Sequence, residues 1–361
     1  MTARHAPVQA SLEDVPIYVV TGFLGSGKTT ILRNIISQPG MADTALIINE
    51  FGEVGLDHVL VESSFDNVLM LDNGCVCCSI RGDLVDTVGD LFTKQAQGSI
   101  PPFSRIIIET TGLADPGPII RDLTTARSLH GRCHLARVIS TIDGVLGPQQ
   151  LRDTDEVSAQ IALADLCLVT KADIAGRNAV SDLLADLRAI NPALDILVVS
   201  HGKVDAATLF SQLIPAVARN NAHANHAAHD HTHHHAAHDE AHPVHHHHSG
   251  VESWSARIDR PLAWDRLRDW MAMVYSLRAP HILRMKGIFW LAESARPVVM
   301  HGVAGLVSEP TTLTAWPDNK PESQIVFITK GLKAALLEES FATHVLATAE
   351  PVATHGGAHG L

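Results

Sequence analysis

The sequence has no long basic segment. Its 361 residues carry 27 Lys and Arg against 39 Asp and Glu, a formal net charge of −12 with histidine neutral. Nucleic acids and anionic membranes attract proteins whose positive charge is clustered. We therefore expect neither nucleic acid nor a membrane surface as a partner.

Long apolar runs are also missing. No apolar run approaches the roughly 20 residues that a membrane-spanning helix needs. The first residues show no basic stretch followed by an apolar one, as a secretory signal would. We therefore expect a cytoplasmic protein. Because 46% of the residues are hydrophobic, a sizeable core can form.

Cysteine is scarce, and its distribution is uneven. Of the five cysteines, Cys75, Cys77 and Cys78 fall within four positions. Such spacing is too tight for a disulfide framework, and it indicates metal or redox chemistry in a reducing compartment. The isolated Cys133 and Cys167 are expected to be ordinary packing residues.

Short apolar runs alternate with helical patterns from residue 15 to about residue 218. This alternation predicts an α/β domain of the P-loop type, with a mostly parallel sheet covered by helices on both faces. The expected strands are Pro16–Thr21, Thr44–Asn49, Asn67–Leu71, Arg105–Glu109, Leu135–Asp143, Leu166–Thr170 and Ile196–Ser200.

A change of composition divides the chain at residues 219–250. This segment consists largely of His, Ala, Asn and Asp and holds thirteen of the 23 histidines, so we expect a disordered linker. Residues 1–14 and 345–361 are expected to be a flexible leader and tail. A smaller C-terminal α/β domain is expected over residues 251–344. Its expected strands are Glu252–Asp259, Ile282–Leu291, Pro297–Val307 and Gln324–Thr329, with helices beginning near Pro261 and covering Leu332–His344.

Residues 22–29 match the P-loop pattern Gly-x4-Gly-Lys-Thr, between an apolar strand and a helix. Glycines let backbone N–H groups point at phosphate oxygens at the positive end of the helix. Lys28 can reach the β- and γ-phosphates, and the Thr29 hydroxyl can hold Mg²⁺. The expected nucleotide-binding residues here are Gly22, Gly25, Ser26, Gly27, Lys28, Thr29 and Thr30.

Two further strand ends refine the prediction. Glu109 ends an apolar strand and is followed by Gly112, so the carboxylate is expected to serve Mg²⁺ or water and the glycine to sense the γ-phosphate. Together with Lys28 these are the expected catalytic residues. Thr170, Lys171 and Asp173 follow another strand, where GTPases commonly carry Asn-Lys-x-Asp. An Asp carboxylate can accept both N–H donors of guanine, which favours GTP over ATP.

The cysteine cluster can share one soft cation such as Zn²⁺ or Cu⁺. Zinc takes about four ligands, so three thiolates leave one position open, which suits an ion that must later leave. Buried packing cysteines or a redox pair are the alternatives. The histidines of residues 223–248 can collect Zn²⁺, Co²⁺, Ni²⁺ or Cu²⁺, or the segment is only a spacer.

Taken together, these motifs resemble the CobW-like family of metal-handling P-loop GTPases, and the resemblance covers nearly the whole chain. The segments that carry it are Thr21–Thr30, Asn49–Asp57, Gly74–Ser79, Glu109–Gly112, Thr170–Asp173, the His-rich linker, Trp254–Arg257, Leu283–Gly287 and Pro297–Gly302. Thr170 departs from the Asn that the family pattern has at this position.

The resemblance implies a GTPase that delivers a transition metal, zinc first and cobalt next, to a client metalloprotein. It is similar to the nickel-delivery GTPases for urease and hydrogenase. The family pattern assigns the transferred metal to Cys75, Cys77 and Cys78, with Glu50 as a further ligand, and implies GTP and Mg²⁺ as cofactors. The second domain is expected to recognise the client or to form a homo-oligomer. The alternatives are a passive metal-storage protein with a vestigial P-loop and a P-loop kinase for small molecules.

Overall fold

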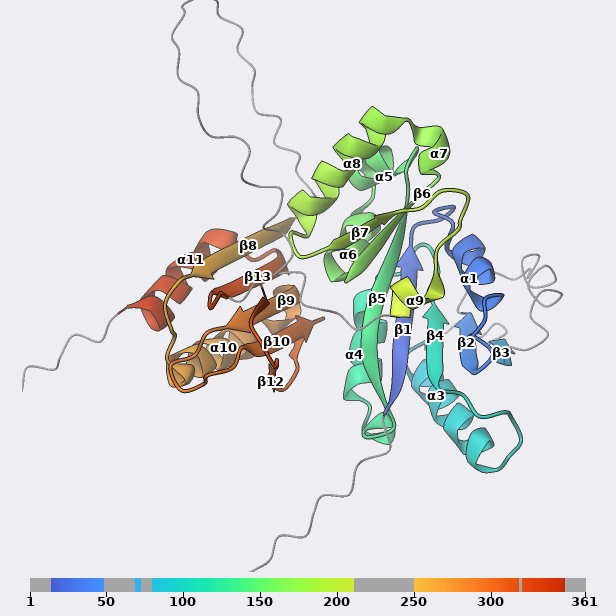
Figure 1. The fold of residues 1–361 in the computed structure, drawn as a ribbon, viewed down its shortest axis with the longest axis horizontal. Coiled ribbons are helices and arrows are strands. Elements are labelled where there is room, and N and C mark those ends of the chain that lie inside the picture. Colours follow the sequence, from blue (N-terminus) through green and yellow to red (C-terminus); the bar gives the residue numbers. More distant parts are fainter. Residues whose placement is uncertain (1–13, 49–68, 73–79, 211–249, 318–319, 348–361) are drawn as a thin grey trace, which may run out of the picture.

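The computed structural model describes residues 14–48, 69–72, 80–210, 250–317 and 320–347, which form two domains (Figure 1). Glu50, Cys75, Cys77, Cys78 and the histidine-rich segment up to Ser249 lie outside these residues. Within the described part of the chain, no helix is long and apolar enough to cross a bilayer.

The N-terminal domain is built on a seven-stranded parallel sheet with the strand order β3-β2-β4-β1-β5-β6-β7. The seven strands predicted from the sequence are therefore confirmed, with ends that differ by one or two residues in most cases. Their bounds are β1 Val15–Gly22, β2 Thr44–Ile48, β3 Leu69–Asp72, β4 Arg105–Glu109, β5 Cys133–Asp143, β6 Leu166–Thr170 and β7 Asp195–Val198.

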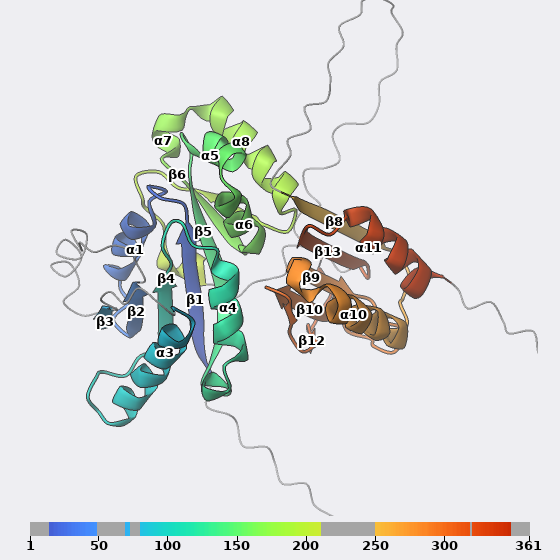
Figure 2. The same ribbon diagram turned by 180° about the vertical axis from the view of Figure 1, so that it is seen from behind.

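Helices cover both faces of this sheet (Figure 2). Along β1, Tyr18 and Val20 pack in one core with α1 and α9, while Ile17 and Val19 pack in another core with α3 and α4. Both faces of β1 are therefore buried, which explains its unbroken apolar sequence. The helices are α1 Lys28–Ile36, α3 Ile80–Ala96, α4 Pro116–Thr125, α5 Gly147–Asp153, α6 Asp155–Leu163, α7 Ala172–Ala175, α8 Arg177–Ile190 and α9 Ala206–Phe210.

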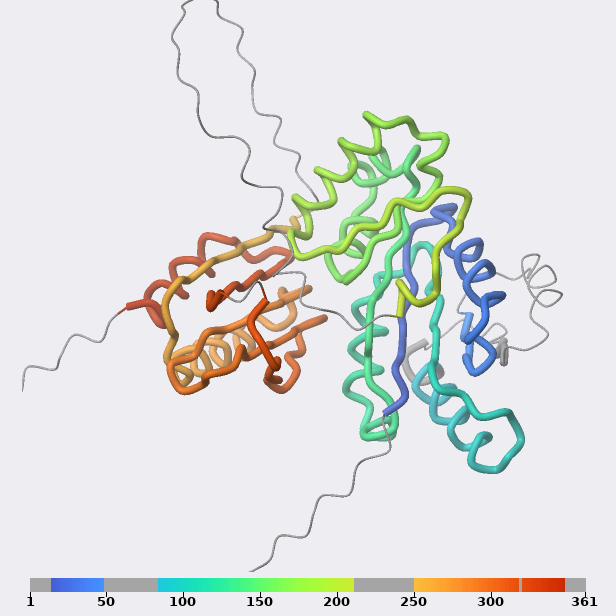
Figure 3. The backbone as a smooth tube through the Cα atoms, viewed as in Figure 1, coloured from blue at the N-terminus to red at the C-terminus, as the bar shows by residue number. Residues whose placement is uncertain are grey.

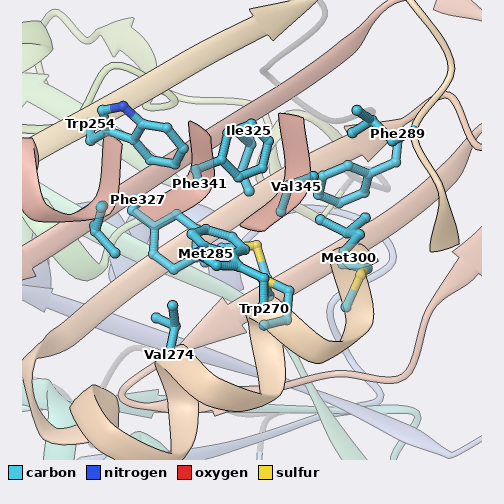
Figure 4. Close-up of a cluster of buried hydrophobic side chains, with 14 of the residues drawn as sticks. Trp254, Trp270, Val274, Met285, Phe289, Met300, Ile325, Phe327, Phe341 and Val345 are labelled. Carbon is cyan, nitrogen blue, oxygen red and sulfur yellow. The ribbon is translucent and has the colours of Figure 1, made fainter. Parts of the chain in front are cut away.

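The C-terminal domain has an antiparallel sheet with the order β11-β10-β9-β13-β8, and β12 pairs with β10. Helices α10 and α11 pack against one face of it. Between them lies an aromatic core in which Trp270 is 5.0 Å from Phe341 and 5.7 Å from Phe327, measured between ring centroids (Figure 4). The elements are β8 Val251–Ile258, α10 Trp264–Arg278, β9 Ile282–Phe289, β10 Val298–Val303, β11 Leu306–Val307, β12 Thr311–Thr312, β13 Ser323–Lys330 and α11 Ala334–Phe341.

Two sequence predictions for this domain were wrong in detail. The single strand predicted over Pro297–Val307 is a hairpin of β10 and β11, because the chain reverses at Ala304 and Gly305, both of which have positive φ. The helix predicted from Pro261 begins only at Trp264, after Leu262 has formed a bridge to Leu291. Since apolar residues continue through the hairpin, hydrophobic pattern alone could not locate this turn.

The second face of the C-terminal sheet packs on the N-terminal domain. Val326 and Ile328 of β13 belong to the same buried cluster as residues of α6, α8 and β6. The tube in Figure 3 shows the start of the C-terminal domain beside the end of α8, and Ser253 of β8 donates a hydrogen bond to the Ala189 carbonyl there. The two domains thus share part of one apolar core.

Candidate nucleotide site

The loop between β1 and α1 has the geometry of a phosphate cradle. Gly27 caps α1 with φ of 93°, a left-handed conformation that favours glycine. The Ser26 hydroxyl donates to the Phe23 carbonyl at 2.7 Å and closes the turn. The first N–H groups of α1, which have no partners within the helix, therefore face the loop, as anion binding at a helix N-terminus requires.

Lys28 bends back over this loop. Its ammonium group donates to the Gly22 carbonyl at 2.7 Å and to the Phe23 carbonyl at 3.2 Å, and the residue is buried. A cation held at the centre of the loop complements the negative charge of phosphate oxygens.

The Thr29 hydroxyl and the Glu109 carboxylate meet beside the cradle. Thr29 Oγ1 donates to Glu109 Oε1 at 3.1 Å, and Glu109 is only 1% exposed at the end of β4. Strands β1 and β4 are parallel neighbours, so their carboxyl ends place the two side chains together. Hydroxyl and carboxylate oxygens are the hard ligands that Mg²⁺ prefers, so this donor pair fits the ion.

The turn after β4 lies directly on the P-loop. A Cβ atom added to Gly112 would lie 2.6 Å from Leu24 Cδ2 and 2.7 Å from the Leu24 backbone nitrogen. Gln160 of α6 holds the turn through its side-chain amide, which donates to the Gly112 and Ala114 carbonyls at 3.2 and 3.1 Å. The turn and the cradle are therefore in direct contact. Gln160 was not predicted as a site residue, because nothing in the sequence around it indicates this role.

The end of β6 is also tied to the P-loop. The Thr170 hydroxyl lies 2.7 Å from the Ser26 carbonyl, to which it can donate. The Lys171 ammonium donates to the Gly25 carbonyl at 2.9 Å and to Asp143 Oδ2 at 2.5 Å. Thr170 thus supplies a hydroxyl donor to the loop at the position where the common motif has Asn. Asp143 was not predicted as a site residue, although it is a carboxylate at the end of a strand, as Glu109 is.

Asp173 lies in the short helix α7 that follows. Its carboxylate accepts a hydrogen bond from the His201 backbone N–H at 3.2 Å, and His201 Nδ1 is 3.3 Å from the second oxygen. That backbone hydrogen bond is the main reason that the pKa of Asp173 lies below its ordinary value. A carboxylate kept ionised at this edge can accept N–H donors from a base. His201 was not singled out from the sequence.

The expected ligands of the transferred metal, Glu50, Cys75, Cys77 and Cys78, lie outside the described residues, so the structure does not place them. Strand β3, which precedes the cysteine cluster in sequence, is the edge strand next to β2. In the described part of the chain, no group of three or more His, Cys, Asp or Glu side chains could hold a metal ion. Cys167 is buried on β6, and burial raises the pKa of Cys133 to about 11. Both thiols are protonated at neutral pH, as expected of packing residues.

Two family models match the chain. The model of the CobW/HypB/UreG nucleotide-binding domain matches residues 16–198, which include β1, the P-loop, β4 and β6. The model of the cobalamin synthesis protein CobW C-terminal domain matches residues 251–345.

Individual proteins show the same similarity. The chain is 31% identical over 331 residues to the zinc chaperone YjiA of Escherichia coli (strain K12), covering 92% of this chain and 99% of that protein. It is 29% identical over 232 residues to the zinc chaperone CobW of a Sinorhizobium species, covering 56% of this chain and 63% of that protein. The crystal structure of Zn(II)-bound YjiA GTPase from E. coli superposes with a TM-score of 0.68 at 28% identity, covering 92% of this chain and 99% of that one.

Proposed function

The chain belongs to the CobW/HypB/UreG nucleotide-binding family, and from this we propose that it is a GTP-hydrolysing metallochaperone for a client metalloprotein. The observation that supports this best is that Lys28, Glu109 and Lys171 each make a hydrogen bond to a residue of one P-loop. Because the ends of β4 and β6 are hydrogen-bonded to the P-loop, binding of a γ-phosphate in the loop can affect both strand ends.

Three residues serve the hydrolysis. Lys28 turns from the loop carbonyls to the β- and γ-phosphate oxygens and offsets the charge that develops there. Glu109 orients the attacking water, whose oxygen bonds to the γ-phosphorus while the bridging bond breaks and leaves its electron pair on GDP. The Gly112 turn senses the γ-phosphate and, through its contact with Leu24, follows the position of the P-loop.

The remaining loop residues bind the nucleotide. Backbone N–H groups of Gly22, Gly25 and Gly27 face the phosphates, Ser26 shapes the loop through its hydrogen bonds to the Phe23 carbonyl, and the hydroxyl of Thr30 adds a donor. Thr29 and Glu109 would hold Mg²⁺, which would offset the negative charge of the phosphates. Asp173 accepts hydrogen bonds from the N–H groups of the guanine base. Thr170 and Lys171 hold the segment that carries Asp173 against the P-loop through their hydrogen bonds to Ser26 and Gly25.

The transferred metal is proposed to bind Cys75, Cys77 and Cys78, with Glu50 as the fourth ligand. Three thiolates and one carboxylate give the four-coordinate set that zinc takes. Zinc is preferred over cobalt because the similar proteins YjiA and CobW are named zinc chaperones. The histidines of residues 223–248 are proposed to collect the ion, and the C-terminal domain to recognise the client or a second copy of the chain.

Multiple-turnover GTP hydrolysis by the full chain tests the enzymatic part. We expect phosphate release that is lost in Lys28→Ala and retained in Lys94→Ala, a control on the exposed end of α3. Full turnover in Lys28→Ala would contradict the proposal, and no turnover by the unaltered chain would favour a passive metal-storage protein. Appearance of a phosphorylated small molecule in place of free phosphate would favour a kinase.

The coupling to metal is tested by measuring affinities in both directions. Because two ligands that share one conformational equilibrium affect each other equally, stoichiometric Zn²⁺ must change GTP affinity by the factor by which GTP changes Zn²⁺ affinity. We expect the change to vanish in a Cys75→Ser, Cys77→Ser, Cys78→Ser triple variant. Equal GTP affinity with and without Zn²⁺ in the unaltered chain would refute the coupling. Turnover with Zn²⁺ and Co²⁺ buffered at equal free concentrations identifies the preferred metal.

Deletion of residues 221–248 separates the proposed role of the histidines from a structural one. If they collect metal, the shortened chain loads less Zn²⁺ at limiting free concentration and hydrolyses GTP at an unchanged rate. A parallel loss of turnover would instead make the segment structural.

A further inference from the structure

A cavity of about 430 Å³ lies between the two domains. One side is formed by residues of β1, α4 and the start of β5, and the other by β9, β10 and β11. Figure 2 shows α4 facing β9 and β10, and Arg121 of α4 donates to the Ala304 carbonyl of the β10–β11 turn at 2.9 Å. Much of the wall is apolar, from Ile17, Leu123, Leu129, Leu135, Val303 and Leu306.

The polar part of the wall includes Arg284 and Asp165, and Asp165 is also bound by Lys286, which is buried behind the wall. Asp165, just before β6, accepts hydrogen bonds from Arg284 Nη2 and from Lys286 Nζ of β9. Its other oxygen accepts the Val138 N–H at 3.0 Å. The Arg284 and Lys286 side chains are 7% and 2% exposed. Burial alone would raise the pKa of Asp165, but the two cations lower it to about 2, so the carboxylate is ionised.

A further carboxylate, Asp195, is paired with Arg137 at 3.3 Å and also raises the pKa of Lys286 through its charge. His301 of β10 faces the same cavity, and its burial together with the charges of Arg284 and Lys286 lowers its pKa to about 4. The imidazole is therefore neutral at pH 7. Burial lowers the pKa of Lys286, and Arg284 is the cation that lines the cavity.

Arg284 also has an unused donor. Its Nε is buried and has no hydrogen-bond partner among the described residues, and the side chain lines the cavity. A buried charged donor without an acceptor is unfavourable. An anionic acceptor at this place would satisfy that donor.

We propose that this cavity binds a small organic anion. Its carboxylate lies at Arg284 beside the neutral imidazole of His301, and its apolar body lies along Leu123, Leu129 and Leu306. The volume falls in the range of small-molecule pockets, roughly 300–1,000 Å³. A carboxylate supplies the acceptor that Arg284 Nε lacks, and the apolar walls disfavour an anion that is polar on all sides. Since both domains form the walls, the ligand joins them.

Calorimetric titration of the full chain with sodium octanoate tests the site. We expect one octanoate per chain, binding of the neutral octanamide that is about tenfold weaker or more, and no displacement of octanoate by inorganic phosphate. No octanoate binding up to about 10 mM would overturn the proposal. Equal affinity for octanoate and octanamide would also overturn it, because the charge would then have no role.

Two variants of similar exposure place the binding in this cavity. Val307 lines the cavity and is 42% exposed, so Val307→Asp introduces a repelling charge without disturbing the ion cluster. Val198 is 44% exposed on β7 and does not line the cavity, so Val198→Asp is the control. We expect about tenfold weaker octanoate binding in the first variant and unchanged binding in the second. Unchanged binding in Val307→Asp would refute the assignment. Arg284→Met should abolish the preference for octanoate over octanamide.

Discussion

Thr29 Oγ1 lies 3.1 Å from Glu109 Oε1, although 79 residues separate the two positions in the sequence. The pairing follows from the sheet order, because β4 lies directly beside β1 and the strands run parallel. Glu109 ends β4, and Thr29 lies in the first turn of α1, directly after the loop that follows β1. The two oxygens proposed to hold Mg²⁺ therefore come from neighbouring strand–loop–helix segments, and each can be tested by substitution.

Thr29→Val is expected to remove one oxygen from the proposed Mg²⁺ site while keeping the shape of the side chain. GTP turnover at limiting Mg²⁺ should fall by at least the roughly 10–100-fold that loss of an outer-shell partner costs a metal site. Thr93→Val on α3, whose hydroxyl bonds only to the Gly89 carbonyl of its own helix, is the control and should keep full turnover. An unchanged Mg²⁺ dependence in Thr29→Val would exclude the threonine as a ligand.

Gly112→Ala is expected to impair nucleotide binding. Its Cβ would approach the Leu24 backbone to 2.7 Å, so the P-loop must move, and overpacking of this kind costs about 1–3 kcal/mol of stability. Gly89→Ala is the matched change, because no atom lies within 4 Å of its added Cβ. In the middle of α3 it should stabilise the chain by up to about 1 kcal/mol. Thermal unfolding with and without GTP measures both. Equal GTP affinity in the two variants would mean that the Gly112 turn does not affect nucleotide binding by the P-loop.

Asp173→Asn is expected to change the base preference from guanine to xanthine. The amide can no longer accept both guanine N–H groups, but it can donate to the second carbonyl of xanthine. Because hydrogen bonds to charged groups contribute about 1.5–3 kcal/mol, GTP affinity should fall roughly 10–100-fold. Competition of XTP and GTP for the full chain measures the change, with Asp182→Asn on the exposed face of α8 as the control. Retained GTP preference would assign the base site to other residues.

Asp165→Asn is expected to alter the acid stability of the interface between the domains. The pKa of Asp165 falls from 3.8 to about 2 on folding, so its ionised form contributes about 2 kcal/mol of stability above roughly pH 4. That contribution is lost as the pH falls through about 2. At pH 7 the variant leaves two buried cations without their carboxylate, which should destabilise the chain by about 3–5 kcal/mol.

Denaturant unfolding from pH 7 down to pH 2 measures this difference. The stability gap between the unaltered chain and Asp165→Asn should narrow at the acid end. Asp155→Asn is the control, since this exposed carboxylate lies 4.0 Å from Lys330 and should matter by less than about 1 kcal/mol. A gap that stays constant over the whole range would mean that Asp165 does not titrate as described.

The local pattern of the sequence was sufficient for β4 and β6, whose predicted bounds agree with the structure residue for residue. Both strands are continuous apolar runs ended by a polar residue, so local information defines them. The hairpin of β10 and β11 was missed because Ala304 continues the apolar pattern while its backbone turns with φ of 50°. Only the packing of the finished sheet selects that turn.

The partners of the candidate site were the least predictable part. Asp143, Gln160 and His201 come from β5, α6 and the segment after β7, far in sequence from the residues that they contact. Sequence spacing identifies residues that share one loop, such as Lys28 and Thr29. It does not identify a side chain that reaches the loop from another element, because the distance between strands arises only with the sheet order.

The shared core of the two domains also has a consequence for the covalent chain. Val326, Ile328 and the Asp165–Arg284–Lys286 cluster join the domains through side chains rather than through the stretch between Phe210 and Gly250. One peptide bond cut in that stretch leaves every one of these contacts in place. A protease-nicked molecule should therefore migrate as two bands on a denaturing gel and elute as one particle from a sizing column.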